Sequence, residues 1–238
     1  MAAIGALGSA LPRNQRFQES DLVLSIDSLS RSYPLCQVLN ALYSNASVAL
    51  NSVAGESVDF ALATKGVSPT VIIASSKTIS GYHDQVMAPR AGLISFLGRW
   101  MQARTLDAGV MPSHSFFNQL VHVAPTAELS LEKLRLLCIS HRIDADPATR
   151  LTTEQMTDLR IYMNARIVYA LTGPGIAGAI TQTNVFDYRN LGGWNHFGAP
   201  LSSTEITLTG IAEDGTTDEN PQGQVSHVFQ VTFRSQYI

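Results

Sequence analysis

The stretch from Leu151 to Asp187 constrains the fold of this chain more than any other part of the sequence. Thr152 and Gln155 have the spacing of a capping box, so we expect a helix to begin there, with Met156 on its apolar face. The apolar run 166–172 that follows is typical of a buried parallel strand. A helix, a buried strand and a loop of small residues form half of a βαβ repeat, and ligands of open α/β sheets bind at such strand ends.

The loop after this strand contains glycines at 173, 175 and 178, which satisfy the pattern G-x-G-x-x-G. A dinucleotide site also needs a helix that opens on the loop and an acidic residue about 20 positions further on. The segment 181–187 is a poor helix sequence, which disfavours that interpretation. A tight turn that uses glycine for its backbone angles is one alternative, and a family resemblance, given below, is another.

Composition indicates a folded chain with a sizeable core, because 45% of the 238 residues are hydrophobic and 15% are charged. A net charge of −3 and the absence of a basic run argue against a nucleic-acid surface. The histidines are scattered, so we expect no metal site, and Cys36 and Cys138 lie in apolar stretches that suit buried thiols. We expect neither a signal peptide nor a transmembrane segment.

The remaining pattern predicts alternating strands and helices. We expect strands at 21–25, 46–51, 69–74 and 134–139, and a polar loop at 140–149. We expect a helix with Pro34 in its first turn and an apolar stripe, and a second helix at 91–104 that is either a core helix or an amphipathic helix on a membrane surface. The stripe consists of Leu35, Val38, Leu39 and Leu42. The segments 203–209 and 225–233 alternate as antiparallel strands do, so we predict an α/β part at 1–190 and a small β lobe at 191–238.

Several short segments occur in the order found in one enzyme superfamily. Pro69-Thr70 opens a segment similar to its "PTV" strand, Tyr169 to Gly173 matches "YGxTE", and Gly198 to Pro200 matches "GxP". In this order the chain resembles the adenylate-forming (AMP-binding, acyl-CoA synthetase-like) superfamily, most closely its long-chain acyl-CoA synthetases. The resemblance covers nearly the whole chain. It implies a partial adenylation-domain fold: a mostly parallel sheet with flanking helices, followed by a small antiparallel β-barrel lobe.

The chain departs from the superfamily pattern at the positions that carry its chemistry. Gly173 replaces the glutamate that would hold magnesium, and Arg31 stands at the histidine of "PLAH". The segment 140–144 replaces the small residues of "GGAPL", and the phosphate loop that ends in lysine would precede the first residue of this sequence. The resemblance therefore implies no catalytic residue and no metal ligand. It leaves Tyr169, Thr172 and Asp187 as candidate nucleotide-binding residues.

These departures favour a degenerate, non-catalytic domain with an interaction or scaffold role in a larger protein or complex. We expect that this chain alone is not an enzyme, although the superfamily's members are acid–thiol ligases. One alternative is a fragment of an active ATP-dependent long-chain fatty acid–CoA ligase; another is a module that binds a nucleotide or acyl ligand without turnover.

ATP or AMP with Mg²⁺ is expected only for the ligase, and no cofactor otherwise. The expected partner is another protein or the remainder of a longer chain, without nucleic acid. The expected location is intracellular, in the cytoplasm or peripheral to an organelle membrane.

Overall fold

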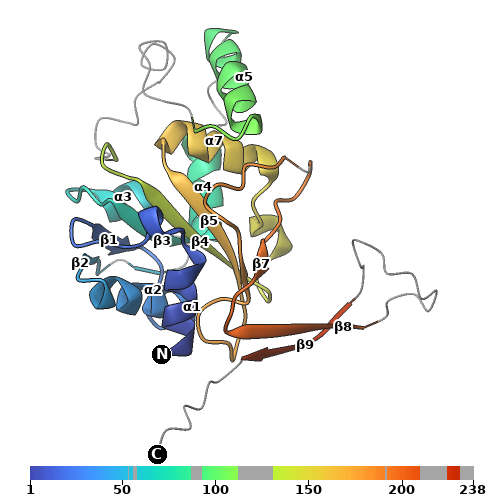
Figure 1. Cartoon of the computed structure of the whole chain (residues 1–238). Helices are drawn as coiled ribbons and strands as arrows, with labels where there is room; N and C mark the ends of the chain where they lie inside the picture. Colours follow the sequence, from blue (N-terminus) through green and yellow to red (C-terminus); the bar gives the residue numbers. More distant parts are fainter. Residues whose placement is uncertain are drawn as a thin grey trace, which may run out of the picture.

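A computed structural model of the chain describes residues 1–52, 54–55, 58–86, 93–111, 131–190, 192–209 and 224–230. Its centre is a seven-stranded sheet with the order β2-β1-β3-β4-β5-β6-β7 (Figure 1). The first five strands of this order pair in parallel, whereas β6 and β7 are added antiparallel. The strands are β1 Leu22–Ser25, β2 Ser47–Leu50, β3 Val71–Ser75, β4 Leu136–Arg142, β5 Arg166–Thr172, β6 Thr181–Gln182 and β7 Ala199–Pro200.

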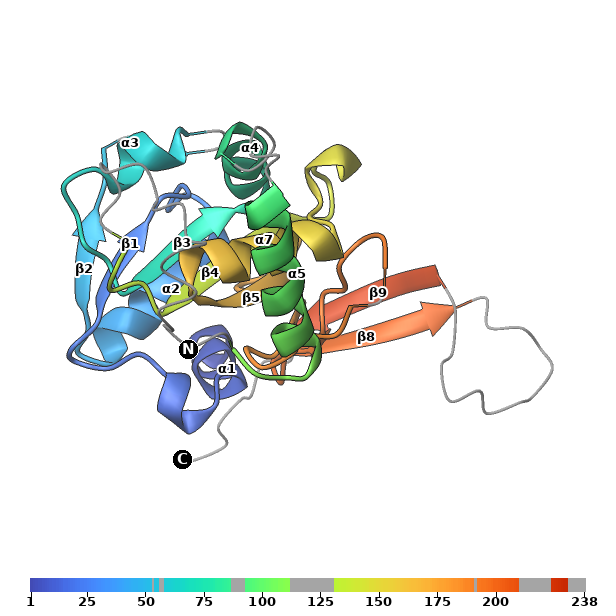
Figure 2. The same ribbon diagram turned by 90° about the horizontal axis from the view of Figure 1, so that it is seen from above.

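Helices cover both faces of this sheet (Figures 1 and 2). One face carries α1 (Ala2–Ala10) and α2 (Ser32–Tyr43), and the other carries α3 (Phe60–Thr64), α4 (Ser76–Val86) and α7 (Thr153–Met163). A further helix, α5 (Leu93–Asp107), contacts α7. Two short 3₁₀ turns, η1 (Arg13–Gln15) and η2 (Pro147–Thr149), complete the helical segments of the described residues.

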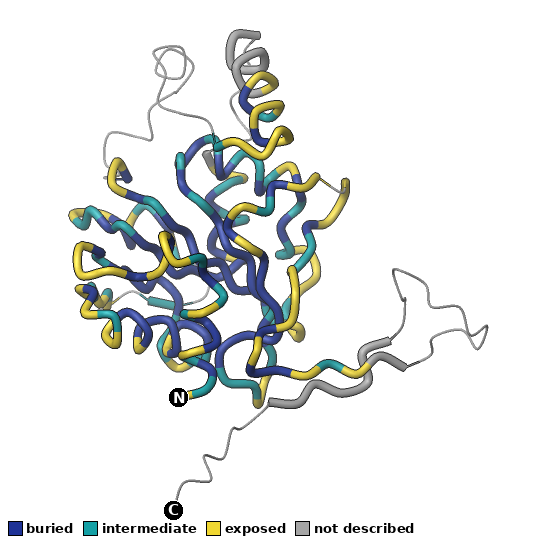
Figure 3. Tube along the Cα trace, viewed as in Figure 1, coloured by how far each residue is buried: buried dark blue, intermediate teal, exposed yellow. Residues whose placement is uncertain are grey.

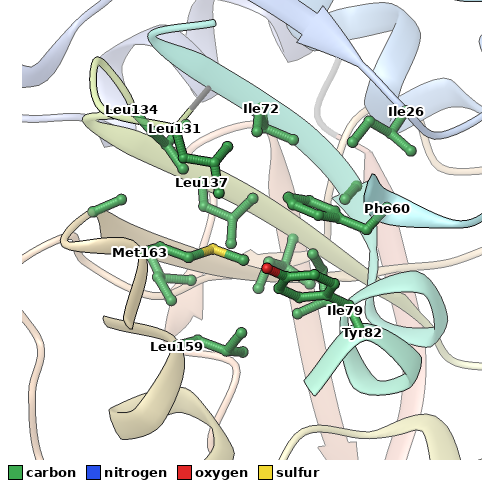
Figure 4. Packing of buried hydrophobic residues seen from close by; sticks show 14 of the residues in the cluster. Ile26, Phe60, Ile72, Ile79, Tyr82, Leu131, Leu134, Leu137, Leu159 and Met163 are labelled. Atoms are coloured by element: carbon green, nitrogen blue, oxygen red, sulfur yellow. The ribbon is translucent and has the colours of Figure 1, made fainter. Parts of the chain in front are cut away.

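The core consists of two layers because successive residues of a strand point to opposite faces of the sheet. In β3, Ile72 belongs to the layer under α3, α4 and α7, while Val71 and Ile73 belong to the layer under α1 and α2. Figure 4 shows the first layer, where Phe60 and Tyr82 lie beside residues of the strands. The tube in Figure 3 is buried along the central strands and exposed at the outer turns of the helices.

The unit α7–β5 confirms the prediction from the capping box. Thr152 Oγ1 accepts a hydrogen bond from the Gln155 amide at 3.1 Å, and Gln155 Oε1 accepts one from the Thr152 amide at 2.9 Å. Asn164 caps the C-terminus of the helix and adopts the left-handed conformation with φ of 47°. Met156 on the apolar face is fully buried. The capping box therefore satisfies backbone amides at the start of α7 that have no partner within the helix.

The predicted apolar stripe of α2 lies mostly on the outward face of the helix. Leu35, Leu39 and Leu42 point away from the sheet and are 41%, 40% and 55% exposed, although Val38 of the predicted stripe is buried. The buried face of α2 is instead made largely of aromatic, small and polar residues, namely Tyr33, Pro34, Cys36, Gln37, Asn40 and Ala41. One of their polar groups has a partner in the core, because Gln37 Nε2 donates a hydrogen bond to the Tyr33 hydroxyl at 3.1 Å, whereas Gln37 Oε1 is buried without one.

Two other segments differ from expectation. The polar residues Ser140, His141 and Arg142 were predicted as a loop, but β4 continues through them because β5 pairs along its full length. In α5, Trp100 and Met101 are 49% and 65% exposed, so this face of the helix is not part of the core, although Leu106 of the same helix is buried. The guanidinium of Arg104 lies 4.4 Å from the centre of the Trp100 ring.

The chain after residue 190 first returns to the main sheet and then forms a separate hairpin. β7 pairs with β6, while β8 (Thr204–Thr209) and β9 (Gln224–Gln230) form an antiparallel pair of their own. The predicted closure of this lobe into a barrel lies outside the described residues. The boundary near residue 190 stays a prediction.

Gly198 makes the return to β7 sterically feasible. Its φ is +74°, and a Cβ atom built there would lie 2.2 Å from the carbonyl oxygen of Gln182. Gly192 also has a positive φ, of +72°, but nothing lies within 4 Å of a Cβ built at that position. A side chain at Gly198 would therefore cause both a steric clash and backbone strain, whereas a side chain at Gly192 would cause backbone strain alone.

A buried ion pair anchors the start of β1. Asp21 accepts hydrogen bonds from Arg135 Nε at 2.7 Å, Thr70 Oγ1 at 2.8 Å and the Gln18 amide at 2.8 Å. Burial alone would raise the pKa of the Asp21 carboxyl, but these hydrogen bonds outweigh it and hold the pKa below its ordinary value of 3.8. The carboxylate form therefore connects the start of β1 to the residues that immediately precede β3 and β4.

His83 connects α4 to α7. Its Nε2 lies 3.2 Å from Asp158 Oδ2, and its Nδ1 lies 3.3 Å from Asp84 Oδ1. Burial alone would lower the pKa of His83. The hydrogen bonds and charges of both carboxylates raise the pKa by more than burial lowers it, so that the net shift is upward. The charged imidazolium is the form that holds these helices together.

Both cysteines are buried free thiols, as predicted. Burial raises the pKa of Cys138 to about 12, which keeps this thiol protonated. Among the described residues, no helix is long and apolar enough to cross a membrane.

Candidate ligand site at the carboxyl edge of the sheet

The carboxyl ends of β1, β3, β4 and β5 meet at one edge because these strands are parallel. From β1 the chain passes to β2 on one side of β1, and it then crosses to the other side of β1 to form β3, β4 and β5. The strand order therefore reverses between β1 and β3, which is the position where open α/β sheets bind ligands.

Two cavities lie at this edge, with volumes of about 200 Å³ and about 660 Å³. Arg31, Ser140 and Arg142 line both of them. The smaller cavity is otherwise lined by Ser75, Ser76, Lys77, Asp144, Ala145, Asp146 and Thr149. Hydroxyl groups and cationic side chains therefore dominate a site that lies at the expected ligand position.

The two arginines shared by the cavities are engaged by carboxylates of the same chain. Arg31 Nη1 lies 3.4 Å from Oδ1 of Asp27, whose side chain is fully buried. Arg142 forms a two-pronged contact with Asp144, in which Nε donates to Oδ1 at 2.8 Å. The hydrogen bond from Arg142 is the main reason why the pKa of Asp144 is lowered. Much of the positive charge at this edge is thus balanced within the chain.

Ser76, which lines the smaller cavity, pairs with the buried side chain of His141. Ser76 Oγ lies 2.9 Å from Nδ1 of His141, and the imidazole is stacked on Phe197 with ring centres 5.6 Å apart. Burial, followed by the charge of Arg150, lowers the pKa of His141, so this ring is neutral near pH 7. The sequence singled out neither residue as a partner of the other, since they are separated by 65 positions and meet only through strand order.

Tyr169, a candidate nucleotide-binding residue, lies in the core layer under α7. Its side chain is fully buried, and its hydroxyl accepts a hydrogen bond from the Leu151 amide at 3.1 Å. The ring contacts Phe197 with ring centres 4.7 Å apart. Burial raises the pKa of the phenol to about 12. These contacts give the hydroxyl a structural partner at the start of α7.

Thr172 and Asp187, the other two candidates, lie at opposite ends of β5. Thr172 lines the larger cavity, and its Oγ1 donates to the His141 carbonyl at 3.2 Å. Asp187 follows Phe186, whose ring lies 5.4 Å from the guanidinium of Arg166 at the amino end of the strand. The structure therefore does not bring Tyr169, Thr172 and Asp187 together around one cavity.

Asp187 has protein partners in its own surroundings. Arg189 Nε and Nη2 donate to its two carboxylate oxygens at 2.8 Å and 2.6 Å. His196 Nε2 lies 3.4 Å from the same group. The hydrogen bond from Arg189 is the main cause of the lowered pKa of Asp187. A cavity of about 560 Å³ beside Asp187 is lined mainly by apolar atoms, including those of Leu106 and Phe186.

Gly173 stands where the family resemblance would put a magnesium ligand. A Cβ atom built there would lie 3.2 Å from Cδ1 of Ile180 and 3.7 Å from Cγ2 of Ile143. Mg²⁺ prefers oxygen donors in a hydrated, octahedral site, and this position offers an apolar surface instead. Among the described residues, no group of three or more His, Cys, Asp or Glu side chains could hold a metal ion. The residues present thus do not fit the implied metal.

The glycine-rich loop does not form a dinucleotide site. Gly175 and Gly178 have positive φ values of 77° and 79°, as tight turns require. The chain then enters β6 rather than a helix, so no helix N-terminus faces a pyrophosphate. A Cβ atom at Gly178 would lie 3.4 Å from both Ala3 and Leu7, which shows that this loop packs closely against α1.

Comparison with known proteins gives a fold but no family by sequence. No protein-family model matches the sequence, and no curated protein matches it. Among solved structures, the N-terminal domain of FACL13 from Mycobacterium tuberculosis aligns with 94% of this chain at a TM-score of 0.56 and 12% identity. The anthranilate CoA ligase AuaEII aligns with 94% at 0.55 and 14% identity. The O-succinylbenzoate coenzyme A synthetase from Bacillus subtilis aligns with 93% at 0.51 and 15% identity.

These likenesses define the fold class. The described part of the chain has the mixed α/β fold of one portion of the adenylate-forming acyl- and aryl-CoA ligases, as the sequence predicted. The chain spans only 43%, 33% and 35% of those three structures, in the order given above. The closer relation to long-chain acyl-CoA synthetases stays a prediction.

Proposed function

We propose that this chain is a degenerate AMP-binding, acyl-CoA synthetase-like domain that does not form acyl adenylates and serves as an interaction or scaffold segment of a larger protein or complex. The observation that carries the proposal is the position of Gly173. A metal-binding carboxylate would be needed there, but the position has no side-chain oxygen and adjoins Ile143 and Ile180.

The charges around the two cavities support the same conclusion. Adenylate formation brings phosphate and carboxylate charges together, and an enzyme lowers the barrier with preorganised positive groups. Arg31 and Arg142 are the cations shared by the two cavities, and each contacts an aspartate of this chain. An incoming phosphate would have to compete with those carboxylates for both arginines.

Acyl-adenylate formation tests this proposal directly. The purified chain is incubated with ATP, Mg²⁺ and fatty acids of different lengths, and exchange of labelled pyrophosphate into ATP is measured against a heat-inactivated sample. We expect no exchange above that control, and the matched variant Gly173→Glu should not create it because the surrounding groups are unchanged. Exchange by the unmodified chain would overturn the proposal.

A ligand-binding module without turnover is a second candidate, favoured by the cavities of about 200 Å³ and 660 Å³ at the carboxyl edge. Thr172 lines the larger one and is the predicted nucleotide-binding residue nearest to that site. Calorimetric titration with ATP, AMP and fatty acids separates this candidate from a pure scaffold. Heat of binding that Arg142→Ala abolishes would support it, whereas an absence of heat and of any melting shift would remove it.

A fragment of an active fatty acid–CoA ligase is a third candidate, because the chain spans at most 43% of the three solved ligase structures described above. Only this candidate requires ATP or AMP and Mg²⁺. The intact mass of the protein purified from its source tests it: a mass far above 25.7 kDa would favour it, and a mass near that value would oppose it. An intracellular location, cytoplasmic or at an organelle surface, is part of all three proposals.

A further inference from the structure

A serine and a histidine that the proposed function does not use meet beside the smaller cavity. Ser75 of β3 pairs with Ser140 of β4, and the two strands are neighbours in the sheet (Figure 1). The next residues along the two strand directions, Ser76 and His141, therefore lie close together. Ser76 Oγ is 2.9 Å from His141 Nδ1, which is the distance expected between a hydroxyl nucleophile and the base that activates it.

Ser76 has the position of a nucleophile at a junction between a strand and a helix. β3 ends at Ser75 and α4 begins at Ser76, with no residue between them. A serine at such a junction stands at the carboxyl edge of the sheet, as the nucleophile of α/β-hydrolases does, although the flanking glycines of that motif are absent here. Ser76 borders the cavity of about 200 Å³, so a reactant can approach it from that side even though the residue as a whole is buried.

The surroundings of His141 hold its ring as a neutral base. The ring stacks on Phe197 with centres 5.6 Å apart, and its centre lies 6.4 Å from that of the Tyr169 ring. The guanidinium of Arg150 lies 4.9 Å from the centre of the same phenylalanine ring. Burial and the charge of Arg150 hold the pKa of His141 below 6.5. At pH 7 the imidazole is therefore neutral, and Nδ1 can accept the hydroxyl proton.

The start of α4 offers a positive environment for the negative charge that develops when a nucleophile attacks an acyl carbon. The Thr78 amide donates to Ser75 Oγ at 3.2 Å. The Lys77 amide precedes it in the first turn, where amides have no acceptor within the helix. This turn contains no acidic residue, and Lys77 lines the cavity. A helix N-terminus and a lysine both stabilise a developing oxyanion.

We propose that Ser76 is an acyl acceptor activated by His141, and that it takes a small acyl group from a donor with a weakly basic leaving group. Ser76 Oγ forms a bond to the acyl carbon, and the bond from that carbon to the leaving group breaks. The leaving group departs as an anion with the electron pair of the broken bond. The hydroxyl proton passes to His141 Nδ1 and from the imidazolium to solvent, which completes the reaction at the acyl-serine.

The cavity and the base together limit the acyl donor. A cavity of about 200 Å³ is smaller than the roughly 300–1,000 Å³ of sites for drug-sized ligands, so it admits a short acyl group. The charge of Arg150 makes His141 a weaker base, which activates a hydroxyl only modestly. The acyl carbon must therefore be reactive already, as in an aryl ester, a thioester or an acyl phosphate. This reaction goes beyond the proposed function and is separate from adenylate formation, because it consumes no ATP.

Acylation by para-nitrophenyl acetate tests the proposal. The full chain is incubated with this ester, release of nitrophenolate is followed, and mass spectrometry of peptides locates the acetyl group. We expect acetylation of Ser76, which Ser76→Ala should abolish. His141→Asn keeps an amide near the position of Nδ1 but supplies no base, so it should slow the reaction at least about 100-fold. The matched control Ser80→Ala changes the serine about one turn further along α4 and should leave the rate unchanged.

The pH dependence of the rate separates activation by His141 from incidental acetylation. The rate should rise with pH and level off above the pKa of His141, which lies below 6.5. Circular dichroism shows whether each variant is folded, and the site of acetylation in the unmodified chain decides the outcome if a variant does not fold. An unmodified chain without acetyl on Ser76, or with acetyl on Lys77 alone, would overturn the proposal. So would a folded His141→Asn variant that is acetylated on Ser76 as fast as the unmodified chain, since the histidine would then not be the base.

Discussion

The substitution Tyr169→Phe separates a structural role of this hydroxyl from a role in nucleotide binding. In the structure the hydroxyl accepts the Leu151 amide at 3.1 Å, and both residues are fully buried. Phenylalanine keeps the ring and its contact with Phe197 but leaves the amide without this acceptor. An unsatisfied buried donor costs about 1–3 kcal/mol, so we expect the free energy of unfolding to fall by that amount. For a chain of this size, each kcal/mol corresponds to about 2–4 °C in melting temperature.

Urea unfolding, followed by circular dichroism, gives the free energy for the variant and the unmodified chain. Tyr43→Phe is the matched control, because Tyr43 is 81% exposed and loss of its hydroxyl should change the free energy by less than about 0.5 kcal/mol. The reasoning would be refuted if Tyr169→Phe were as stable as the unmodified chain. It would also be refuted if the variant kept full stability but lost affinity for AMP, since the hydroxyl would then contact the ligand.

Three further substitutions test the stability assignments. Asp21→Asn should lower stability near neutral pH, because partners such as Arg135 depress the folded-state pKa of this carboxyl. The stabilisation is present above the unfolded-state pKa and disappears as the pH falls through the folded-state pKa. Acid unfolding curves should therefore show a weaker pH dependence in the variant. His83→Gln should lower stability at pH values below the ordinary histidine pKa of 6.5 and have little effect at high pH. The folded-state pKa is raised, so the charged imidazolium stabilises the fold, and this contribution is lost as the pH rises through the folded-state pKa. Equal losses of stability at pH 5 and pH 9 would contradict this. Gly198→Ala should cost about 3 kcal/mol or more in urea unfolding, whereas Gly192→Ala should cost only the backbone strain of about 1–2 kcal/mol; equal costs would remove the steric argument.

Local signals in the sequence predicted the elements that depend on neighbouring residues. The capping box of Thr152 and Gln155 located α7, and the apolar run 166–172 located β5, because caps and short buried strands depend on local chemistry. The spacing of Leu35 and Leu39 correctly indicated one helix face, but spacing alone does not say whether that face points inward. The interior instead received the face with Gln37, whose amide nitrogen donates to the Tyr33 hydroxyl.

The candidate site was less predictable because it depends on which strands are neighbours. Ser76 and His141 meet only because β3 pairs with β4, and nothing local to either residue indicates that pairing. The extension of β4 through His141 was missed for the same reason, since polar residues remain in a strand when the partner strand continues beside them. The family resemblance identified Gly173 as a departure, and the structure added its apolar neighbours.

The contact between α1 and the loop after β5 has a consequence for folding while the chain is being synthesised. Leu7 packs beside Gly178, and Ser32 at the start of α2 donates to the Ile176 carbonyl at 2.8 Å. The first two helices therefore lack part of their packing surface until the residues around 178 have left the ribosome. During that interval their apolar faces are open to chaperones and to other nascent chains. We expect nascent chains that stop before β5 to be captured by chaperones, and chains that include β6 to be released.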